Sequence, residues 1–120
     1  MKFNVGDTIT FSWRPDRPVK VTEKMYLAVA RLRSLGIIAA RRRSTVTYGE
    51  AEAAIDRAYV AQGLGPALDL LSWDCYERGE MSLACLFVRK DSGEVGYGFV
   101  DADAAGAGRE ELYDYWAKAI

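Results

Sequence analysis

The sequence predicts one α+β domain that spans residues 1–120. Apolar residues recur at helical spacing in four separate stretches. Two apolar runs flank the turn chemistry of residues 91–94, which indicates a β-hairpin near the C-terminal end. Hydrophobic residues make up 50% of the chain and charged residues 28%, which is the balance of a globular chain and not of a disordered one.

The chain opens with a β-prone stretch at residues 3–13, in which apolar residues alternate with a period near two. Gly6 and Asp7 are typical turn residues, so this stretch forms either a short hairpin or a single edge strand. Pro15 and Pro18 are expected to end it, because proline lacks the N–H that a strand ladder needs. Residues 1–18 are therefore an N-terminal strand extension, and residues 22–100 form the core of the domain.

Thr22 is the expected N-cap of the first helix. Gly36 is a candidate end for this helix, although the apolar residues 37–40 either prolong it or form a buried connector. A run of three arginines follows, and the β-prone residues 44–47 predict a short strand. The apolar face of the helix consists of Met25, Val29, Leu32 and Leu35.

Thr47 and Glu50 have the spacing of a capping box, so they are expected to begin the second helix. That helix is predicted to end near Gly63. Gly65-Pro66 opens the third helix, with proline at its tolerated first position, and Gly79 ends it. The inner faces of the two helices are predicted to consist of Ala51, Ala54, Ile55, Ala58 and Tyr59, and of Leu64, Leu68, Leu71 and Cys75.

Residues 83–88 are continuously apolar and predict a strand with both faces covered. Its hairpin partner is expected at residues 96–100, followed by a small-residue loop at 101–108 and a C-terminal helix at 107–119. The resulting order is three helices with a β-hairpin wing, short N-terminal strands and a C-terminal helix. This is the order of a winged helix.

The turn Thr47-Tyr48-Gly49-Glu50, followed by two helices and a hairpin, resembles the DNA-binding domain of the alkyltransferase-like winged helices. The likeness covers residues 24–99, and Cys85 precedes Gly93 by the eight residues that separate the reactive cysteine from the hairpin glycine in that family. It implies a DNA-binding fold. The family's Pro-Cys-His-Arg signature is replaced here by Ala84-Cys85-Leu86-Phe87, so alkyl transfer is not expected.

A second likeness covers more of the chain. The pattern Gly63-Leu64-Gly65-Pro66, Cys75-Tyr76-Glu77-Arg78-Gly79, Val88-Arg89-Lys90-Asp91-Ser92-Gly93-Glu94 and the tail Tyr113-Asp114-Tyr115-Trp116 is similar to small uncharacterised bacterial and phage proteins. This resemblance supports the fold and implies no activity.

Charge is distributed unevenly, although the net charge is only −1. Residues 14–57 hold ten bases and five acids, and residues 58–120 hold five bases and eleven acids. The protein can therefore present one positive and one negative face. Arginine is suited to phosphate contact. The candidate contacts to nucleic acid or an acidic partner are Lys20, Lys24, Arg41, Arg42, Arg43, Arg89 and Lys90.

An alternative is a protein-interaction or inhibitor module, such as one encoded by a phage or mobile element, that uses its acidic half. The candidate contacts for that role are Asp69, Asp74 and Glu77, on an acidic face of the third helix. Such a face would repel phosphate unless it were turned away from the nucleic acid.

The chain contains no histidine, which removes the commonest general base and metal ligand at neutral pH. Cys75 and Cys85 have apolar neighbours and are expected to be buried thiols, with a disulfide as the alternative. No run reaches the length of a signal sequence or a membrane span. We therefore expect a cytoplasmic, non-enzymatic binding module without a cofactor, metal or membrane contact.

Overall fold

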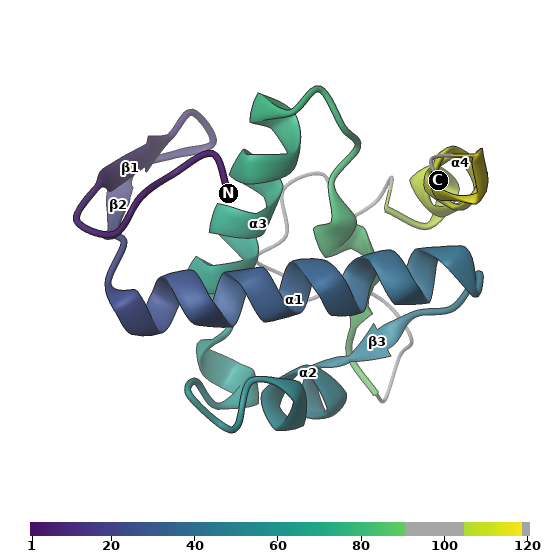
Figure 1. The fold of residues 1–120 in the computed structure, drawn as a ribbon, viewed down its shortest axis with the longest axis horizontal. Coiled ribbons are helices and arrows are strands. Elements are labelled where there is room, and N and C mark those ends of the chain that lie inside the picture. Colours follow the sequence, from purple (N-terminus) through teal and green to yellow (C-terminus); the bar gives the residue numbers. More distant parts are fainter. Residues whose placement is uncertain (91–104, 119–120) are drawn as a thin grey trace.

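The computed structural model describes residues 1–90 and 105–118 and has an α+β fold, as expected (Figure 1). In these residues four α-helices accompany an antiparallel strand pair and a parallel strand pair. In chain order the elements are β1 (Thr8–Phe11), β2 (Arg14–Lys20), α1 (Glu23–Arg41), β3 (Val46–Thr47), α2 (Tyr48–Ala54), the 3₁₀-helix η1 (Ala61–Gly63), α3 (Gly65–Glu77), the 3₁₀-helix η2 (Leu83–Leu86), β4 (Phe87–Val88) and α4 (Ala105–Lys118).

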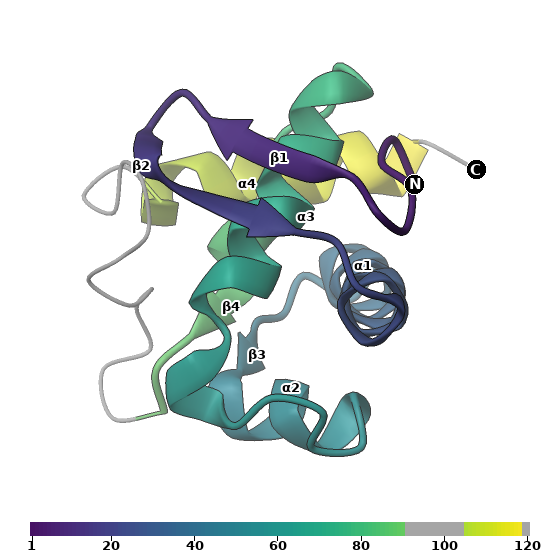
Figure 2. The same ribbon diagram turned by 90° about the vertical axis from the view of Figure 1, so that its left-hand side faces the viewer.

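α1 lies along the longest axis of the molecule, and the other elements are arranged around it. α3 crosses it, and the β1–β2 hairpin lies beside α3 near the N-terminal end of α1 (Figures 1 and 2). α4 packs near the opposite end of α1, next to η2. The hairpin therefore covers part of α3, and α4 covers the other end of α1.

The N-terminal stretch is a hairpin whose turn lies between Phe11 and Arg14. Gly6 and Asp7 also lie in a turn, as their residue types predict, but it precedes β1: Gly6 has a φ of 99°, and the Asp7 N–H donates to the Asn4 carbonyl at 3.1 Å. The prediction that Pro15 and Pro18 end the strand was wrong, because both lie inside β2. The paired positions of β2 are Arg14, Val19 and Lys20, so neither proline stands opposite a β1 residue in the ladder. A strand with one open edge accommodates proline in this way.

α1 begins as predicted, with the Thr22 hydroxyl accepting a hydrogen bond from the Met25 N–H at 3.1 Å. It does not end at Gly36 but continues to Arg41. A glycine within a helix costs only about 1 kcal/mol, which packing can offset. A Cβ at Gly36 would lie 3.4 Å from the Leu83 Cβ, so this glycine lets η2 approach α1 closely.

The predicted capping box at α2 is confirmed in both directions, with the Thr47 hydroxyl and the Glu50 carboxylate each accepting the other residue's backbone N–H. The predicted end near Gly63 was wrong, because α2 stops at Ala54. Asp56 and Arg57 have positive φ angles of 53° and 56°, which a continuing right-handed helix excludes.

α3 begins and ends where the sequence predicts. Pro66 lies in its first turn, and Gly79, with φ of +72°, follows its last turn. The N–H groups of Gly79 and Glu80 donate to the carbonyls of Tyr76 and Cys75, and so satisfy the open end of the helix.

The predicted strand at residues 83–88 was mostly wrong. Residues 83–86 form η2, and only Phe87 and Val88 are extended, paired in parallel with β3. Because all six side chains are buried, the apolar run carried no periodicity that separates a strand from a helical turn. The Ser82 hydroxyl accepts the Ala84 N–H and so favours the turn.

The predicted turn at 91–94 and its partner strand at 96–100 lie outside the described residues. The loop predicted at 101–108 is partly wrong, because α4 already begins at Ala105, close to the predicted start of the C-terminal helix.

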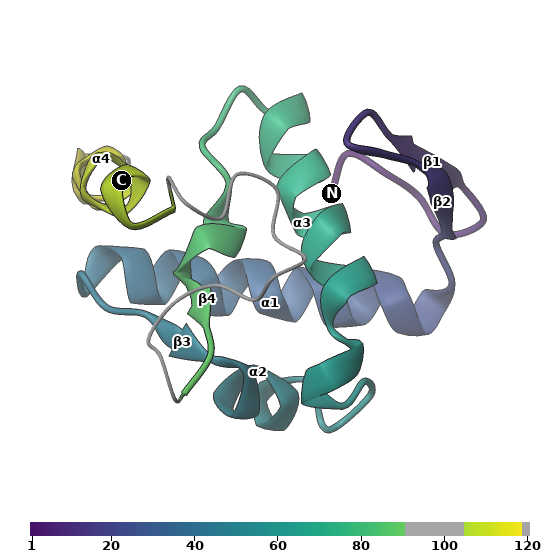
Figure 3. The same ribbon diagram turned by 180° about the vertical axis from the view of Figure 1, so that it is seen from behind.

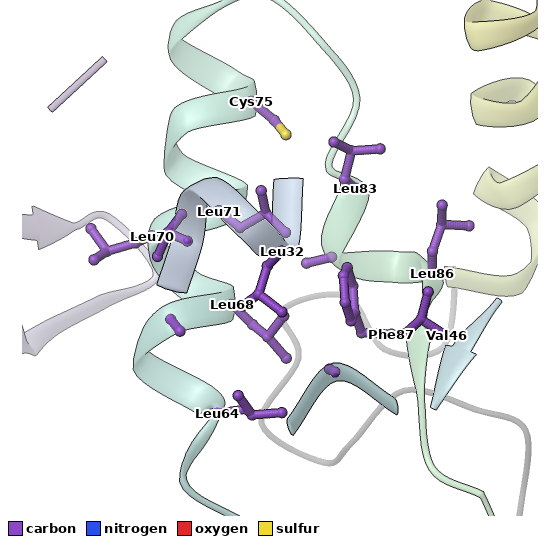
Figure 4. Packing of buried hydrophobic residues seen from close by; sticks show 14 of the residues in the cluster. Leu32, Val46, Leu64, Leu68, Leu70, Leu71, Cys75, Leu83, Leu86 and Phe87 are labelled. Carbon is purple, nitrogen blue, oxygen red and sulfur yellow. The ribbon is translucent and has the colours of Figure 1, made fainter. Parts of the chain in front are cut away.

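The Leu32, Leu71 and Phe87 side chains illustrate the core, in which α1, α3 and the segment from η2 to β4 meet (Figure 4).

Candidate functional site

A groove of about 860 Å³ lies along the first half of α3. Its described lining residues come from β2, the start of α2, η1, α3 and the two residues that follow β4, and Figure 3 shows the arrangement of these elements around α3. Its described lining residues are Arg14, Arg17, Pro18, Val19, Tyr48, Gly49, Ala61, Gln62, Leu64, Gly65, Pro66, Leu68, Asp69, Ser72, Arg89 and Lys90.

The first half of α3 forms the floor of this groove. Leu64, Leu68 and Ser72 recur at successive helical turns, and all three are buried. Val19 of β2 and Tyr48 of α2 are half-buried at the sides. The floor is therefore largely apolar, and it is recessed between the flanking elements.

Four cations surround this apolar floor. Arg14 and Arg17 come from β2, and Arg89 and Lys90 follow β4. Asp69 is the one carboxylate among the described lining residues, which leaves a formal balance of +3. Its partner is Arg14, whose Nε lies 2.8 Å from Asp69 Oδ2.

Arg17 and Lys90 are exposed, and neither forms an ion pair with a carboxylate in the described parts of the chain. Their charge is therefore available to a ligand in the groove. Arg89 is half-buried at the same rim.

The seven cations predicted from the sequence do not form one patch. Arg89 and Lys90 line the groove, but Lys24 and Arg41 stand near opposite ends of α1, about 26 Å apart at 1.5 Å per residue. Lys20 is exposed at the end of β2, and the Lys24 Nζ lies 4.5 Å from the centre of the Tyr59 ring.

Arg43 is exposed and pairs with two carboxylates of α4. Its guanidinium contacts Glu110 at 3.2 Å and Asp114 at 2.5 Å, and the bond to Asp114 is the main reason that its pKa is raised. The neighbours Arg41 and Arg42 are exposed at the end of the same helix. All three arginines of the run are therefore exposed, and Arg43 is ion-paired with α4.

The expectation of an exposed acidic face on α3 was wrong. Asp74 is fully buried and accepts the Lys2 N–H at 2.6 Å and the Arg78 Nε–H at 2.9 Å. Asp69 accepts from the Trp13 indole at 3.1 Å in addition to Arg14. Glu77 is exposed, so α3 presents one of the three predicted carboxylates openly.

Arg14 and Arg17 are the groove residues that sequence reasoning missed. Both belong to the basic stretch of residues 14–57. Because Pro15 and Pro18 predict the end of the strand there, the sequence does not indicate which surface the two arginines occupy. The hairpin register supplies that information, because it folds residues 14–20 back toward α3.

The prediction of two buried, unpaired thiols is confirmed. Burial raises the pKa of both Cys75 and Cys85 to about 11. Neither thiol is thus activated as a nucleophile at neutral pH, since the thiolate is the reactive form.

Within residues 1–90 and 105–118, no three His, Cys, Asp or Glu side chains are grouped as metal ligands would be. In the same part of the chain, no helix combines the length and apolarity that crossing a membrane requires. Comparison with protein-family models, curated proteins and solved structures gave no significant match to this chain.

Proposed function

We propose that this protein is a non-enzymatic binding module that contacts nucleic acid, or a nucleic-acid-associated complex, through the basic-rimmed groove on α3. The observation that carries the proposal is the convergence of Arg14, Arg17, Arg89 and Lys90 on one concavity with one described carboxylate. Phosphate groups supply most of the affinity of proteins for nucleic acid, and Arg and Lys are their usual partners.

The winged-helix likeness supports the same proposal. The order α1, β3, α2, α3 agrees with the order of elements that the likeness requires, and the capping box at Thr47 and Glu50 opens α2. The wing itself was predicted at residues 83–100, and its turn and second strand lie outside the described residues. The winged-helix assignment therefore stays part of the proposal.

The alternative role through Asp69, Asp74 and Glu77 is disfavoured by their contacts. Asp74 has no exposed surface, and Asp69 is bound to Trp13 and Arg14. A partner that bound Asp69 would have to break its ion pair with Arg14 and its hydrogen bond with Trp13, which join the hairpin to α3.

The test is fluorescence anisotropy of a labelled 20-nucleotide oligonucleotide of random sequence, single-stranded and duplex, across a series of salt concentrations. Wild-type protein is expected to bind at low salt and to weaken as salt rises, because binding releases counterions. The double variant Arg17→Ala/Lys90→Ala is expected to lower the slope of log affinity against log salt by about two, one for each lost phosphate contact.

The matched control is Lys20→Ala/Arg42→Ala, which removes two exposed cations away from the groove. It is expected to leave the slope nearly unchanged. An absence of binding at low salt would overturn the proposal, and so would an equal loss in the control variant, because the groove would then have no special role.

A further inference from the structure

α3 is recessed and does not protrude as a duplex-reading helix must. An α-helix with its side chains is about 10–12 Å wide and fills the major groove of B-DNA, which is about 12 Å wide. Here the first half of α3 is the floor of a concavity whose walls are β2, α2 and the end of β4. Leu64, Leu68 and Ser72 on this floor are at most 9% exposed, so they offer a duplex no protruding surface to read.

The other faces of α3 are already in use. Leu70, Leu71 and Cys75 are fully buried in the core (Figure 4). Asp69 and Asp74 are bound to the hairpin and to the N-terminal segment. Rotating α3 to present another face would therefore expose core side chains and break the Arg14–Asp69 ion pair and the Lys2–Asp74 hydrogen bond.

The groove combines an apolar floor with a cationic rim, which is the composition that binds unpaired nucleotides. A flexible single strand can direct its bases into a concavity while its phosphates stay at the edge. The volume of about 860 Å³ lies within the range of about 300–1,000 Å³ that is typical of small-molecule pockets. Bases paired within a duplex are stacked and cannot enter such a site.

From this geometry we infer that the groove takes the unpaired nucleotides of a single-stranded DNA or RNA, and this inference rests on the function proposed above. The phosphates lie against Arg17, Arg89 and Lys90 at the rim. A base lies in the groove beside the half-buried Tyr48 ring, above the start of α3, where Pro66 is exposed and Leu64 and Leu68 are buried. Because aromatic stacking accepts every base, the site has little sequence preference.

The first experiment compares three labelled probes with the full-length protein at low salt: a thymidine 12-mer, a uridine 12-mer, and the thymidine 12-mer annealed to its complement. Both single strands are expected to bind at least about ten-fold more tightly than the duplex, since stacking contributes a factor of roughly five to 150 per base. Equal or tighter binding of the duplex would overturn the inference and leave the proposed function intact.

The second experiment tests the base-stacking position. Tyr48→Leu is expected to weaken single-strand binding about ten-fold, and Tyr48→Phe is expected to keep most of the affinity because it keeps the ring. The control is Tyr115→Leu, which makes the same change at a ring on α4 that is 42% exposed and does not line the groove. Circular dichroism verifies that each variant is folded.

The outcomes separate the two claims. If no probe binds, the proposed function fails. If the single strands bind preferentially but Tyr48→Leu and Tyr115→Leu behave alike, the placement of the base over the groove floor is overturned. Preferential binding that is lost in Tyr48→Leu and kept in Tyr48→Phe supports the inference in full.

Discussion

Arg33 connects three parts of the fold through one side chain. Its guanidinium forms a bidentate pair with Glu80 at 2.8 and 3.0 Å and lies 3.7 Å from the fully buried Asp74. The bond to Glu80 is the main reason that the pKa of Arg33 is raised. The same guanidinium lies 5.8 Å from the centre of the Trp116 ring, so α1, the end of α3 and α4 all meet at this residue.

Asp74→Asn is expected to destabilise the protein by about 3–5 kcal/mol. The change keeps the size of the side chain but removes the negative charge that balances Arg33 and Arg78, and losing one partner of a buried pair leaves an uncompensated charge. The measurement is the free energy of unfolding from urea denaturation at neutral pH.

The matched control is Asp56→Asn, which makes the same change at the exposed ion pair with Arg31. Asn also tolerates the positive φ of 53° at this position. The control is expected to cost less than about 1 kcal/mol, because exposed pairs contribute little. If the two variants lost equal stability, burial of the Asp74 cluster would not be what makes it matter.

At the scale of elements, the helix starts were predictable and the helix ends less so. Thr22, Thr47 and Pro66 act through their own chain neighbours, so their roles can be inferred from short patterns. Gly36 does not end α1. Its glycine is needed for the close packing of Leu83, which lies 47 positions later in the sequence. η2 was predicted as a strand for a related reason, since uniform burial removes the periodicity that distinguishes the two.

The capping box of α2 gives a stability difference that depends on pH. Hydrogen bonds from the backbone and side chain of Thr47 lower the pKa of Glu50 below its ordinary value near 4.5. Because the pKa of Glu50 is lower in the folded than in the unfolded protein, its charge stabilises the fold fully at pH values above the unfolded-state pKa. This stabilisation is lost as the pH falls through the folded-state pKa. The contribution is therefore present at pH 7 and absent in strong acid.

Glu50→Gln is the variant that reveals this dependence, because glutamine can still accept the Thr47 N–H but carries no charge. At pH 7 it is expected to be less stable than wild type by about 0.3–1 kcal/mol, the usual contribution of a negative charge at a helix start. The difference should vanish as pH falls below 4.5, measured by thermal unfolding across a pH series. A difference that persists at low pH would contradict the assignment to charge.

At the scale of the whole molecule, opposite charges from the two halves of the sequence pair within the fold. Among the residues that the structure describes, five ion pairs connect a base in residues 14–57 with an acid in residues 58–120. They are Arg14–Asp69, Arg33–Asp74, Arg33–Glu80, Arg43–Glu110 and Arg43–Asp114. The arrangement of the remaining charges into one positive and one negative face stays a prediction, since these pairs involve three of the ten bases in residues 14–57.

The candidate site was only half predictable from the sequence. Arg89 and Lys90 were predicted as the basic residues at the tip of the hairpin wing, whereas Arg14 and Arg17 reach the groove only through the pairing of β1 with β2. A short pattern cannot indicate that residues about 75 positions apart share a rim, since that proximity depends on tertiary packing.

The substitution Leu112→Ala tests whether the chain unfolds as one domain. Leu112 is fully buried and belongs to the same hydrophobic cluster as Phe3, although the two residues come from opposite ends of the described chain. Leu112→Ala is expected to cost about 2–5 kcal/mol, because it removes buried methyl groups and leaves a cavity. If α4 shares one cooperative core with the hairpin, circular dichroism and tryptophan fluorescence should report the same shifted urea midpoint.

The control for this prediction is Leu27→Ala, the same substitution at a side chain of α1 that is 55% exposed. It is expected to change the stability by no more than about 0.5 kcal/mol, because little apolar surface is buried there. Two separate transitions in Leu112→Ala, with helix signal lost first and the remaining signal at the wild-type midpoint, would show that α4 unfolds independently. A single shifted transition would show that the apolar contacts of α4 join it to the core. The exposed ion pairs of α4 with Arg43 could not have this effect, because exposed pairs contribute too little stability to move the whole midpoint.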